Sequence, residues 1–146
     1  MQKTVLFLCT GNYYRSRFAE HYFNARAEAE GIPVARDSRG LATELGVRNI
    51  GPLSPYTIDA LAGYEIPLPD ERRPPLQVTE ADLCDAELVI ALKEAEHRPL
   101  LAEGHPAWVE RVTYWHIHDL DVAPASHALE EIRREIETLL ILLHSA

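Results

Sequence analysis

One stretch near the start of the chain most constrains how the protein can fold. An apolar run from Val5 to Leu8 is followed by Cys9, then by five further residues, and then by Arg15. A short apolar run bounded by polar residues is typical of a buried strand in a parallel sheet. From Arg15 onward, apolar residues recur at the three- and four-residue spacing of a helix. The sequence therefore predicts a strand, a tight loop that encloses one small tetrahedral anion, and a helix.

The residues of this loop have the properties that anion binding requires. The start of a helix presents unpaired backbone N–H groups and the positive end of the helix dipole. Cys9 in that field is favoured as a thiolate, and the planar fork of Arg15 suits two phosphate oxygens. Gly11 permits close backbone approach, Asn12 tolerates left-handed geometry, and Ser16 can donate a hydrogen bond to the thiolate. The alternative interpretation is that Cys9 is only a small buried apolar residue.

The rest of the chain alternates predicted strands with predicted helices. This alternation predicts an α/β fold with right-handed crossovers, in which ligands bind at the carboxyl ends of strands, and Cys9 follows such an end. The elements expected after the first strand are a helix over 15–31, a weak strand over 34–38, a helix from Ser54-Pro55 to about residue 62, a short helix after Thr79, a strand over 87–92, a helix around Leu100, a strand over 109–117 and a helix over 128–143.

Composition and charge exclude several classes of protein. With 146 residues, 47% of them hydrophobic, the chain is expected to form one globular domain over residues 1–146. A net charge of −9 argues against a nucleic-acid binder or a protein that binds acidic membranes. No apolar run approaches the roughly 18 residues of a membrane span, and we expect no signal peptide. Cys9 and Cys84 do not make a disulfide framework, so the expected location is the cytoplasm.

The loop and several later segments resemble the signature of the low-molecular-weight protein tyrosine phosphatases, a family that shares its fold with the thioredoxin-coupled arsenate reductases. The resemblance implies a single-domain, three-layer α/β sandwich. Its sheet would have four parallel strands in the order 2-1-3-4, with helices on both faces. The resemblance covers essentially the whole chain and rests on Val5 to Asn12, Arg15-Ser16, Ala19-Glu20, Ser38 to Leu41, Asn49, Ser54-Pro55, Asp85 to Ile90, His97 and Asp119.

The resemblance also implies the chemistry. Cys9 would attack the phosphorus of a phosphomonoester to form a phosphocysteine, and Arg15 with the loop amides would hold the phosphate oxygens. Phosphate, sulfate and vanadate would bind as active-site anions, and no cofactor would be needed. The substrate would be a phosphorylated protein or a small aryl phosphate, and the protein would be a monomer or a weak dimer. The phosphate-binding residues implied are Thr10, Gly11, Asn12, Tyr13, Tyr14 and Ser16, with Ser38 in support.

A carboxylic acid must protonate the leaving oxygen and later deprotonate the attacking water. In the family this acid is an aspartate after the last strand, usually followed by proline. Asp119 is preferred because its distance from Trp115 matches the family spacing. Leu120 stands where that proline is expected, so Asp121 is an alternative acid. A further interpretation is that both aspartates merely end a strand.

The chain departs from the family pattern within the loop. Tyr13 and Tyr14 replace a small apolar residue and a second cysteine, so the disulfide that many members use against oxidation cannot form. The two tyrosines either wall the site and stack on an aromatic substrate or pack into the core. Arg17 replaces a proline, and the aromatic pair common after the acid is replaced by Val122 and Ala123.

Three other functions fit parts of the sequence. His116, His118, Asp119 and Asp121 suggest a metal site, but no further cluster completes a set of ligands, so we expect no metal. An arsenate reductase would need further cysteines for a relay, and Cys84 has no cysteine neighbour. A non-catalytic phosphate or phosphoprotein-binding module would keep the loop but lack a well-placed acid. The leading hypothesis is a phosphomonoester hydrolase of the tyrosine phosphatase type.

Overall fold

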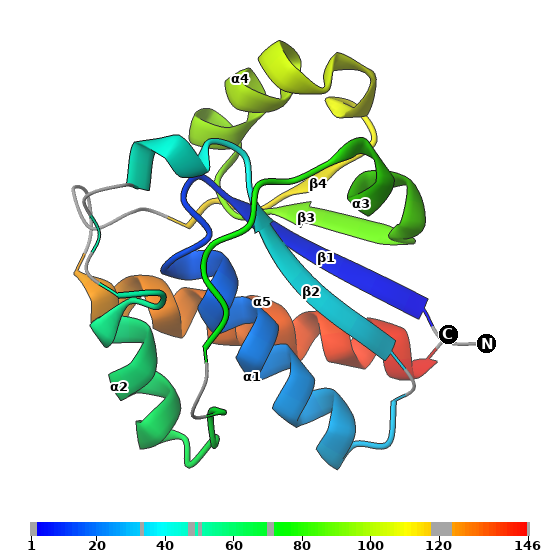
Figure 1. Ribbon diagram of the computed structural model, residues 1–146. Coiled ribbons are helices and arrows are strands. Elements are labelled where there is room, and N and C mark those ends of the chain that lie inside the picture. The colour runs from blue at the N-terminus through cyan, green and yellow to red at the C-terminus, as the bar shows by residue number, and fades with distance from the viewer. Residues whose placement is uncertain are drawn as a thin grey trace.

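A computed structural model describes residues 3–32, 34–46, 49, 51–69, 72–117 and 124–145. Strands and helices alternate along these residues, as the sequence predicts (Figure 1). The elements are β1 (Lys3–Cys9), α1 (Arg15–Ala29), β2 (Val34–Gly40), the 3-10 helix η1 (Thr43–Gly46), α2 (Pro55–Gly63), α3 (Glu80–Asp85), β3 (Leu88–Ala91), α4 (Glu94–Gly104), the 3-10 helix η2 (Pro106–Trp108), β4 (Thr113–Tyr114) and α5 (Ala125–Ser145).

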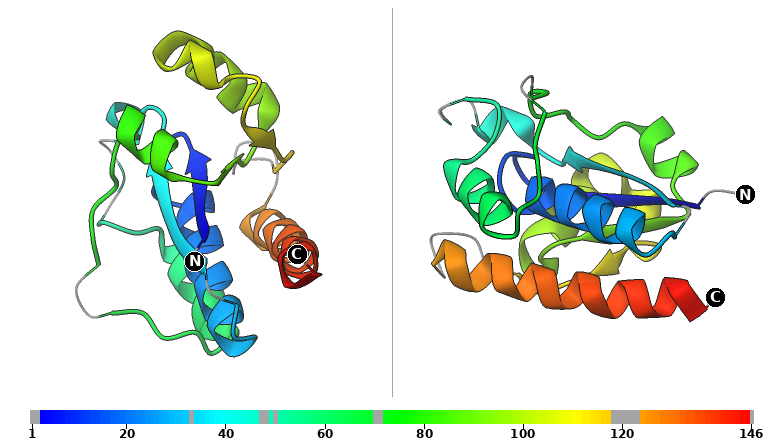
Figure 2. Two further views of the ribbon diagram at one scale, coloured as in Figure 1. Left: turned by 90° about the vertical axis from the view of Figure 1, so that its right-hand side faces the viewer. Right: turned by 90° about the horizontal axis from the view of Figure 1, so that it is seen from below.

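The sheet is parallel and has the strand order β2-β1-β3-β4, which confirms the predicted topology. Helices α1, α2 and α5 cover one face, and α3 and α4 cover the other (Figures 1 and 2). The three-layer α/β arrangement follows from β1, a central strand that is buried on both sides. Its side chains alternate between the faces, because Val5 and Phe7 belong to one hydrophobic cluster while Leu6 and Leu8 belong to the other.

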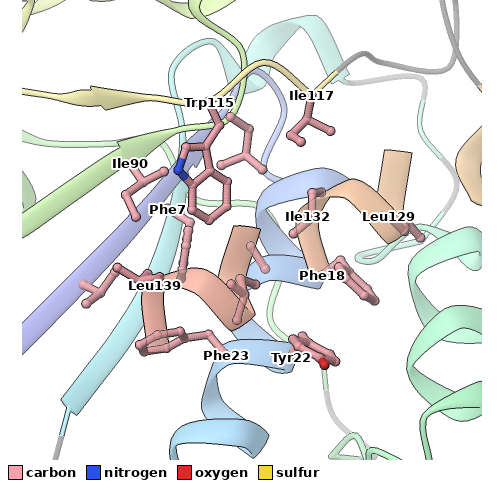
Figure 3. Packing of buried hydrophobic residues seen from close by; sticks show 14 of the residues in the cluster. Phe7, Phe18, Tyr22, Phe23, Ile90, Trp115, Ile117, Leu129, Ile132 and Leu139 are labelled. Carbon is pink, nitrogen blue, oxygen red and sulfur yellow. The ribbon is translucent and has the colours of Figure 1, made fainter. Parts of the chain in front are cut away.

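The larger cluster packs α1 and α5 against the sheet. Phe7 meets Phe23 of α1 edge-on, with ring centroids 5.7 Å apart, and lies 6.0 Å from the ring of Trp115 (Figure 3). Leu129, Ile132 and Ile136 bury the predicted apolar face of α5 in this cluster. Burial of such side chains contributes about 1.5–3 kcal/mol each, so this face holds the last helix on the sheet. No helix within the described residues is both long and apolar enough to cross a membrane.

The observed elements differ from the predicted ones mainly at their ends. The strand predicted over 109–117 is confined to Thr113–Tyr114, because the 3-10 helix η2 and a turn occupy the residues before it. Helix α5 begins at Ala125, three residues before the predicted start. Helices α2 and α3 begin where the sequence predicts, and each is capped: Ser54 accepts a hydrogen bond from the Tyr56 N–H, and Thr79 forms a capping box with Asp82.

The topology brings three strand ends to one edge of the sheet. Cys9 ends β1 and pairs in register with Gly40, the last residue of β2, and Leu8 pairs with Ala91 at the end of β3. The segment around Leu76 then passes beside Gly40, since the Gly40 N–H donates to the Leu76 carbonyl at 2.7 Å. The loop after Cys9 is therefore enclosed by the ends of two neighbouring strands and by a later segment of the chain.

Candidate active site

The loop between β1 and α1 surrounds the sulfur of Cys9. Cys9 is only 3% exposed. Its Sγ lies 2.9 Å from the Ser16 Oγ and accepts a hydrogen bond from the Asn12 N–H at 3.3 Å. When the sulfur is a thiolate, Ser16 is the donor of the first contact, which is the contact predicted from the sequence. Both donors stabilise negative charge on sulfur at the start of a helix.

Asn12 fixes the turn of the loop. Its φ of 52° lies in the left-handed region, as its residue type predicts, and its side chain is fully buried. The side-chain Nδ2 donates to Ser16 and to Ser38, each at 2.9 Å. The Oδ1 accepts from the Leu76 N–H at 3.0 Å and from the Arg73 Nη1 at 2.9 Å. Asn12 thus joins the loop to α1, β2 and the segment around Leu76.

A cluster of buried and partly buried polar side chains supports Asn12. Ser38 is buried on β2 and donates to the Glu20 Oε1 at 2.5 Å. The Arg73 Nη2 reaches the same Glu20 oxygen at 2.7 Å and donates to the Ser38 carbonyl at 3.0 Å. Arg73 therefore links Asn12, Ser38 and Glu20 with one planar guanidinium.

Arg15 opens α1 with a guanidinium that is almost completely buried, since the side chain is 3% exposed. Its Nη1 donates to the Ile117 carbonyl at 3.0 Å, and its Nη2 donates to the Glu96 Oε2 at 2.7 Å. The Thr10 hydroxyl donates to the same oxygen of Glu96. The cation is therefore held at the carboxyl end of the sheet beside the loop.

Glu96 is ionised in this environment. Burial alone would raise its pKa, but hydrogen bonds from His97, Arg15 and Thr10 together with the charge of Arg15 outweigh it and hold the pKa far below its ordinary value. The carboxylate is thus stabilised by the same groups that it orients.

Arg17 has a structural role. It is buried and donates to the carbonyls of Asn12, Pro52 and Arg73 at 3.3, 3.2 and 2.9 Å. Burial, followed by the positive charge of Arg73, lowers its pKa to about 10, so it stays a cation at neutral pH. Arg17 thus connects the segments at Pro52 and at Arg73 to the start of α1.

The two loop tyrosines have different surroundings. Tyr14 is 7% exposed, packs in the larger hydrophobic cluster and contacts Tyr56 edge-on. Of the two interpretations given for the tyrosines, packing into the core therefore holds for the ring of Tyr14. Tyr13 is partly exposed and packs at the margin of that cluster. The Tyr13 carbonyl accepts from the Ser54 N–H at 3.0 Å, and the Tyr14 carbonyl accepts from the Thr57 hydroxyl at 2.9 Å. These bonds attach the loop to the start of α2.

The structure brings most of the predicted site residues together. Cys9 and Arg15 flank the loop of Thr10 to Tyr14, and Ser16 and Ser38 lie directly behind it. Both candidate acids, Asp119 and Asp121, and also His118, lie outside the described residues. Within the described part of the chain, no group of three or more histidine, cysteine or acidic side chains is arranged to hold a metal.

Sequence reasoning did not identify Arg73 and Glu96 as site residues. Arg73 lies between the helices predicted to end at about residue 62 and to begin after Thr79, outside every predicted element, and it contacts Asn12 across 61 positions of sequence. Thr10 directly follows β1, and Glu96 lies in the helix that follows β3, so the shared carboxyl edge of the two strands was the available signal.

Gly40 is where the loop approaches β2 most closely, and it generates a prediction. A Cβ at this position would lie 2.6 Å from the Thr43 Cγ2, 2.8 Å from the Thr10 carbonyl oxygen and 3.2 Å from the Asn12 Cβ. Gly40→Ala must therefore displace the loop backbone, and we expect it to cost about 1–3 kcal/mol of unfolding free energy and to weaken phosphate binding. Thermal unfolding and phosphate titration measure the two effects.

Gly63→Ala is the matched control for this change, because a Cβ on Gly63 at the end of α2 meets no atom within 4 Å. We expect its phosphate binding to equal that of the parent and its stability to be equal or higher by up to about 1 kcal/mol, because alanine reduces the conformational entropy of the unfolded chain. The close approach at Gly40 has no role in the site if Gly40→Ala behaves like this control.

Comparison with known proteins identifies the family. Residues 4–146 match the family described as low molecular weight phosphotyrosine protein phosphatase. A protein-arginine-phosphatase of Bacillus subtilis (strain 168) is 31% identical over 108 residues, which are 74% of this chain and 67% of that protein. The crystal structure of a low molecular weight protein tyrosine phosphatase from T. tengcongensis superposes with a TM-score of 0.76 at 27% identity, covering 95% of this chain and 98% of that one.

The YwlE arginine phosphatase of Geobacillus stearothermophilus has the same fold, with a TM-score of 0.75 at 22% identity over 98% of this chain and 94% of that one. The observed strand order and the cysteine loop agree with the family that matches residues 4–146. The chain belongs to the low molecular weight phosphotyrosine protein phosphatase family, a family of cysteine-dependent hydrolases.

Proposed function

We propose that the protein hydrolyses phosphomonoesters through a phosphocysteine intermediate on Cys9, with Arg15 binding the phosphate and Asp119 acting as general acid and base. The observation that carries this proposal is the contact between the buried Sγ of Cys9 and the N–H of Asn12 at the start of α1. A sulfur that accepts a hydrogen bond from a loop amide and lies 2.9 Å from the Ser16 hydroxyl at the start of a helix is placed to act as a nucleophile.

The reaction has two steps. In the first, the thiolate forms the sulfur–phosphorus bond while the bond from phosphorus to the leaving oxygen breaks, and Asp119 gives its proton to that oxygen. In the second, Asp119 takes a proton from a water that attacks phosphorus, and the sulfur leaves as the thiolate. The loop amides and Arg15 stabilise the charge that develops on the equatorial phosphate oxygens in both transition states.

The position of Ile117 supports Asp119 as the acid. The Ile117 carbonyl accepts from the Arg15 guanidinium, and Asp119 follows only two residues later. Asp121 follows four residues after Ile117 and is the alternative acid. Both follow closely in sequence the residue whose carbonyl contacts Arg15.

The position of Cys84 favours hydrolysis over arsenate reduction. Cys84 is exposed near the end of α3, and three residues later the Glu87 N–H donates to the carbonyl of Thr4 near the start of β1, which is at the amino edge of the sheet. Cys9 lies at the carboxyl edge, because β1 and β3 are parallel. An internal relay between the two sulfurs would have to span the sheet. Both cysteines are free thiols, which fits the proposed cytoplasmic location.

A phosphorylated protein is the proposed substrate class. The family description points to phosphotyrosine, and the partly exposed ring of Tyr13 at the loop offers an aromatic surface for it. Phosphoarginine is the second candidate, because the B. subtilis relative is a protein-arginine-phosphatase. Both substrates need a proton on the leaving atom, which is oxygen in one and nitrogen in the other.

Cys9→Ser tests the nucleophile. We expect it to abolish turnover of an aryl phosphate without added metal, because a serine hydroxyl in this loop is not ionised at neutral pH. Phosphate and vanadate should inhibit the parent competitively. Cys84→Ser is the matched control and should keep full activity. A Cys9→Ser protein as active as the parent would refute the mechanism.

Asp119→Ala and Asp121→Ala identify the acid. We expect Asp119→Ala to lose about 10²–10⁴-fold in kcat with a poor leaving group and much less with a p-nitrophenolate leaving group, which departs without a proton. Asp121→Ala should stay near the parent with both. The reverse pattern assigns the role to Asp121, and two near-parental variants with an active parent would show that neither aspartate is the acid.

A substrate panel distinguishes the two phosphatase classes. Peptides that carry phosphotyrosine, phosphoarginine or phosphoserine are compared by kcat/KM, with Cys9→Ser as the blank. We expect phosphotyrosine to rank first and phosphoserine last. A higher kcat/KM for phosphoarginine would instead assign the chain to the arginine phosphatases. Arsenite release from arsenate that depends on Cys84 would favour the reductase, and phosphate binding without any turnover would favour a binding module.

A further inference from the structure

Glu96 occupies a position that the proposed mechanism does not explain. It lies in the first turn of α4, where a carboxylate interacts favourably with the helix dipole. Its Oε2 accepts from the Arg15 Nη2 at 2.7 Å and from the Thr10 hydroxyl, and it lies 3.1 Å from the His97 Nε2. This one oxygen therefore contacts three groups: Thr10 in the loop, Arg15 directly after the loop, and His97.

His97 holds Glu96 from the protein side. The imidazole is fully buried, and its Nδ1 accepts from the Lys93 N–H at 3.0 Å. The proton of the neutral ring is consequently on Nε2, which faces the Glu96 carboxylate. The start of α4 thus fixes the imidazole, and the imidazole helps to fix the carboxylate.

The contacts of Arg15 define the plane of its guanidinium. Nη1 donates to the carbonyl of Ile117 and Nη2 donates to Glu96, so acceptors on two different chain segments engage the two terminal nitrogens. A guanidinium is planar, and two fixed acceptors leave it little freedom to rotate. An oriented cation loses less entropy and needs less reorganisation when the transition-state charge develops.

We propose that Glu96 is a positioning residue that sets the orientation of the Arg15 guanidinium for phosphate, an inference that rests on the proposed function of Arg15. Glu96 acts through Arg15 and through the Thr10 hydroxyl at the start of the loop. Because all three contacts converge on Oε2, an amide oxygen in the same place keeps them, whereas a methyl group removes them.

The test compares Glu96→Ala, Glu96→Gln and the matched control Glu94→Ala. Glu94 lies in the same turn of α4, but its carboxylate pairs with Arg98 on the surface and makes no contact with the loop among the described residues. We expect Glu96→Ala to lower kcat/KM by about 10–100-fold and to raise the inhibition constant for phosphate. Glu96→Gln should stay within about threefold of the parent, and Glu94→Ala within about twofold, with unfolding temperatures measured for all three.

A double-substitution cycle separates positioning from a general structural role. In the Arg15→Lys background the guanidinium is gone, so adding Glu96→Ala should lower kcat/KM by less than about threefold further. The inference is overturned if Glu96→Ala matches Glu94→Ala, if Glu96→Gln is as impaired as Glu96→Ala, or if the full loss persists in the Arg15→Lys background.

Phosphate binding distinguishes failure of this inference from failure of the proposed function. If the parent shows no turnover but Glu96→Ala weakens phosphate binding by titration more than Glu94→Ala does, the proposed hydrolysis fails and the positioning role stands. If the parent depends on Cys9 for turnover and the Glu96 variants equal the control, the proposed function stands and the positioning role fails.

Discussion

The site depends on one residue held in left-handed backbone geometry. Asn12 can keep a φ of 52° because every polar group of its side chain is engaged, by Ser16, Ser38, Arg73 and the Leu76 N–H. Buried polar groups with complete sets of partners specify a single arrangement, whereas partly satisfied ones are costly. This turn aims the Asn12 N–H at the Cys9 sulfur, so the proposed nucleophile depends on hydrogen bonds that do not touch it.

The parts of the fold that local pattern determines were predictable. The apolar strand ending at Cys9, the helix starting at Arg15 and the capped starts of α2 and α3 all follow from residue type and spacing, and the structure confirms them. The strand order came instead from the family resemblance. The extent of β4 was not predictable, because apolar residues before Thr113 pack as a 3-10 helix and a turn whose periodicity is too short to recognise.

The supporting residues were harder to predict for a different reason. Arg73 and Glu96 reach the loop from segments 61 and 81 positions away from their partners. Nothing in the local sequence marks Arg73, and the signal for Glu96 was only its place after a strand whose carboxyl end lies beside that of β1. Arg17 shows the same limit: the sequence shows only that it stands where the family has a proline, and the fold shows that its buried guanidinium donates to backbone carbonyls. Residue type shows what a side chain can do, and only the tertiary fold selects the partner.

The burial of Tyr14 and the distant position of Cys84 have a consequence for the lifetime of the nucleophile. A thiolate attacked by peroxide forms a sulfenic acid, which a nearby thiol can trap as a disulfide before further oxidation becomes irreversible. Here the loop offers a tyrosine in the core, and the second cysteine lies across the sheet. If Cys9 is the nucleophile that we propose, its recovery from oxidation relies on small-molecule or protein thiols supplied by the surroundings, and the proposed activity then depends on the reducing state of the compartment.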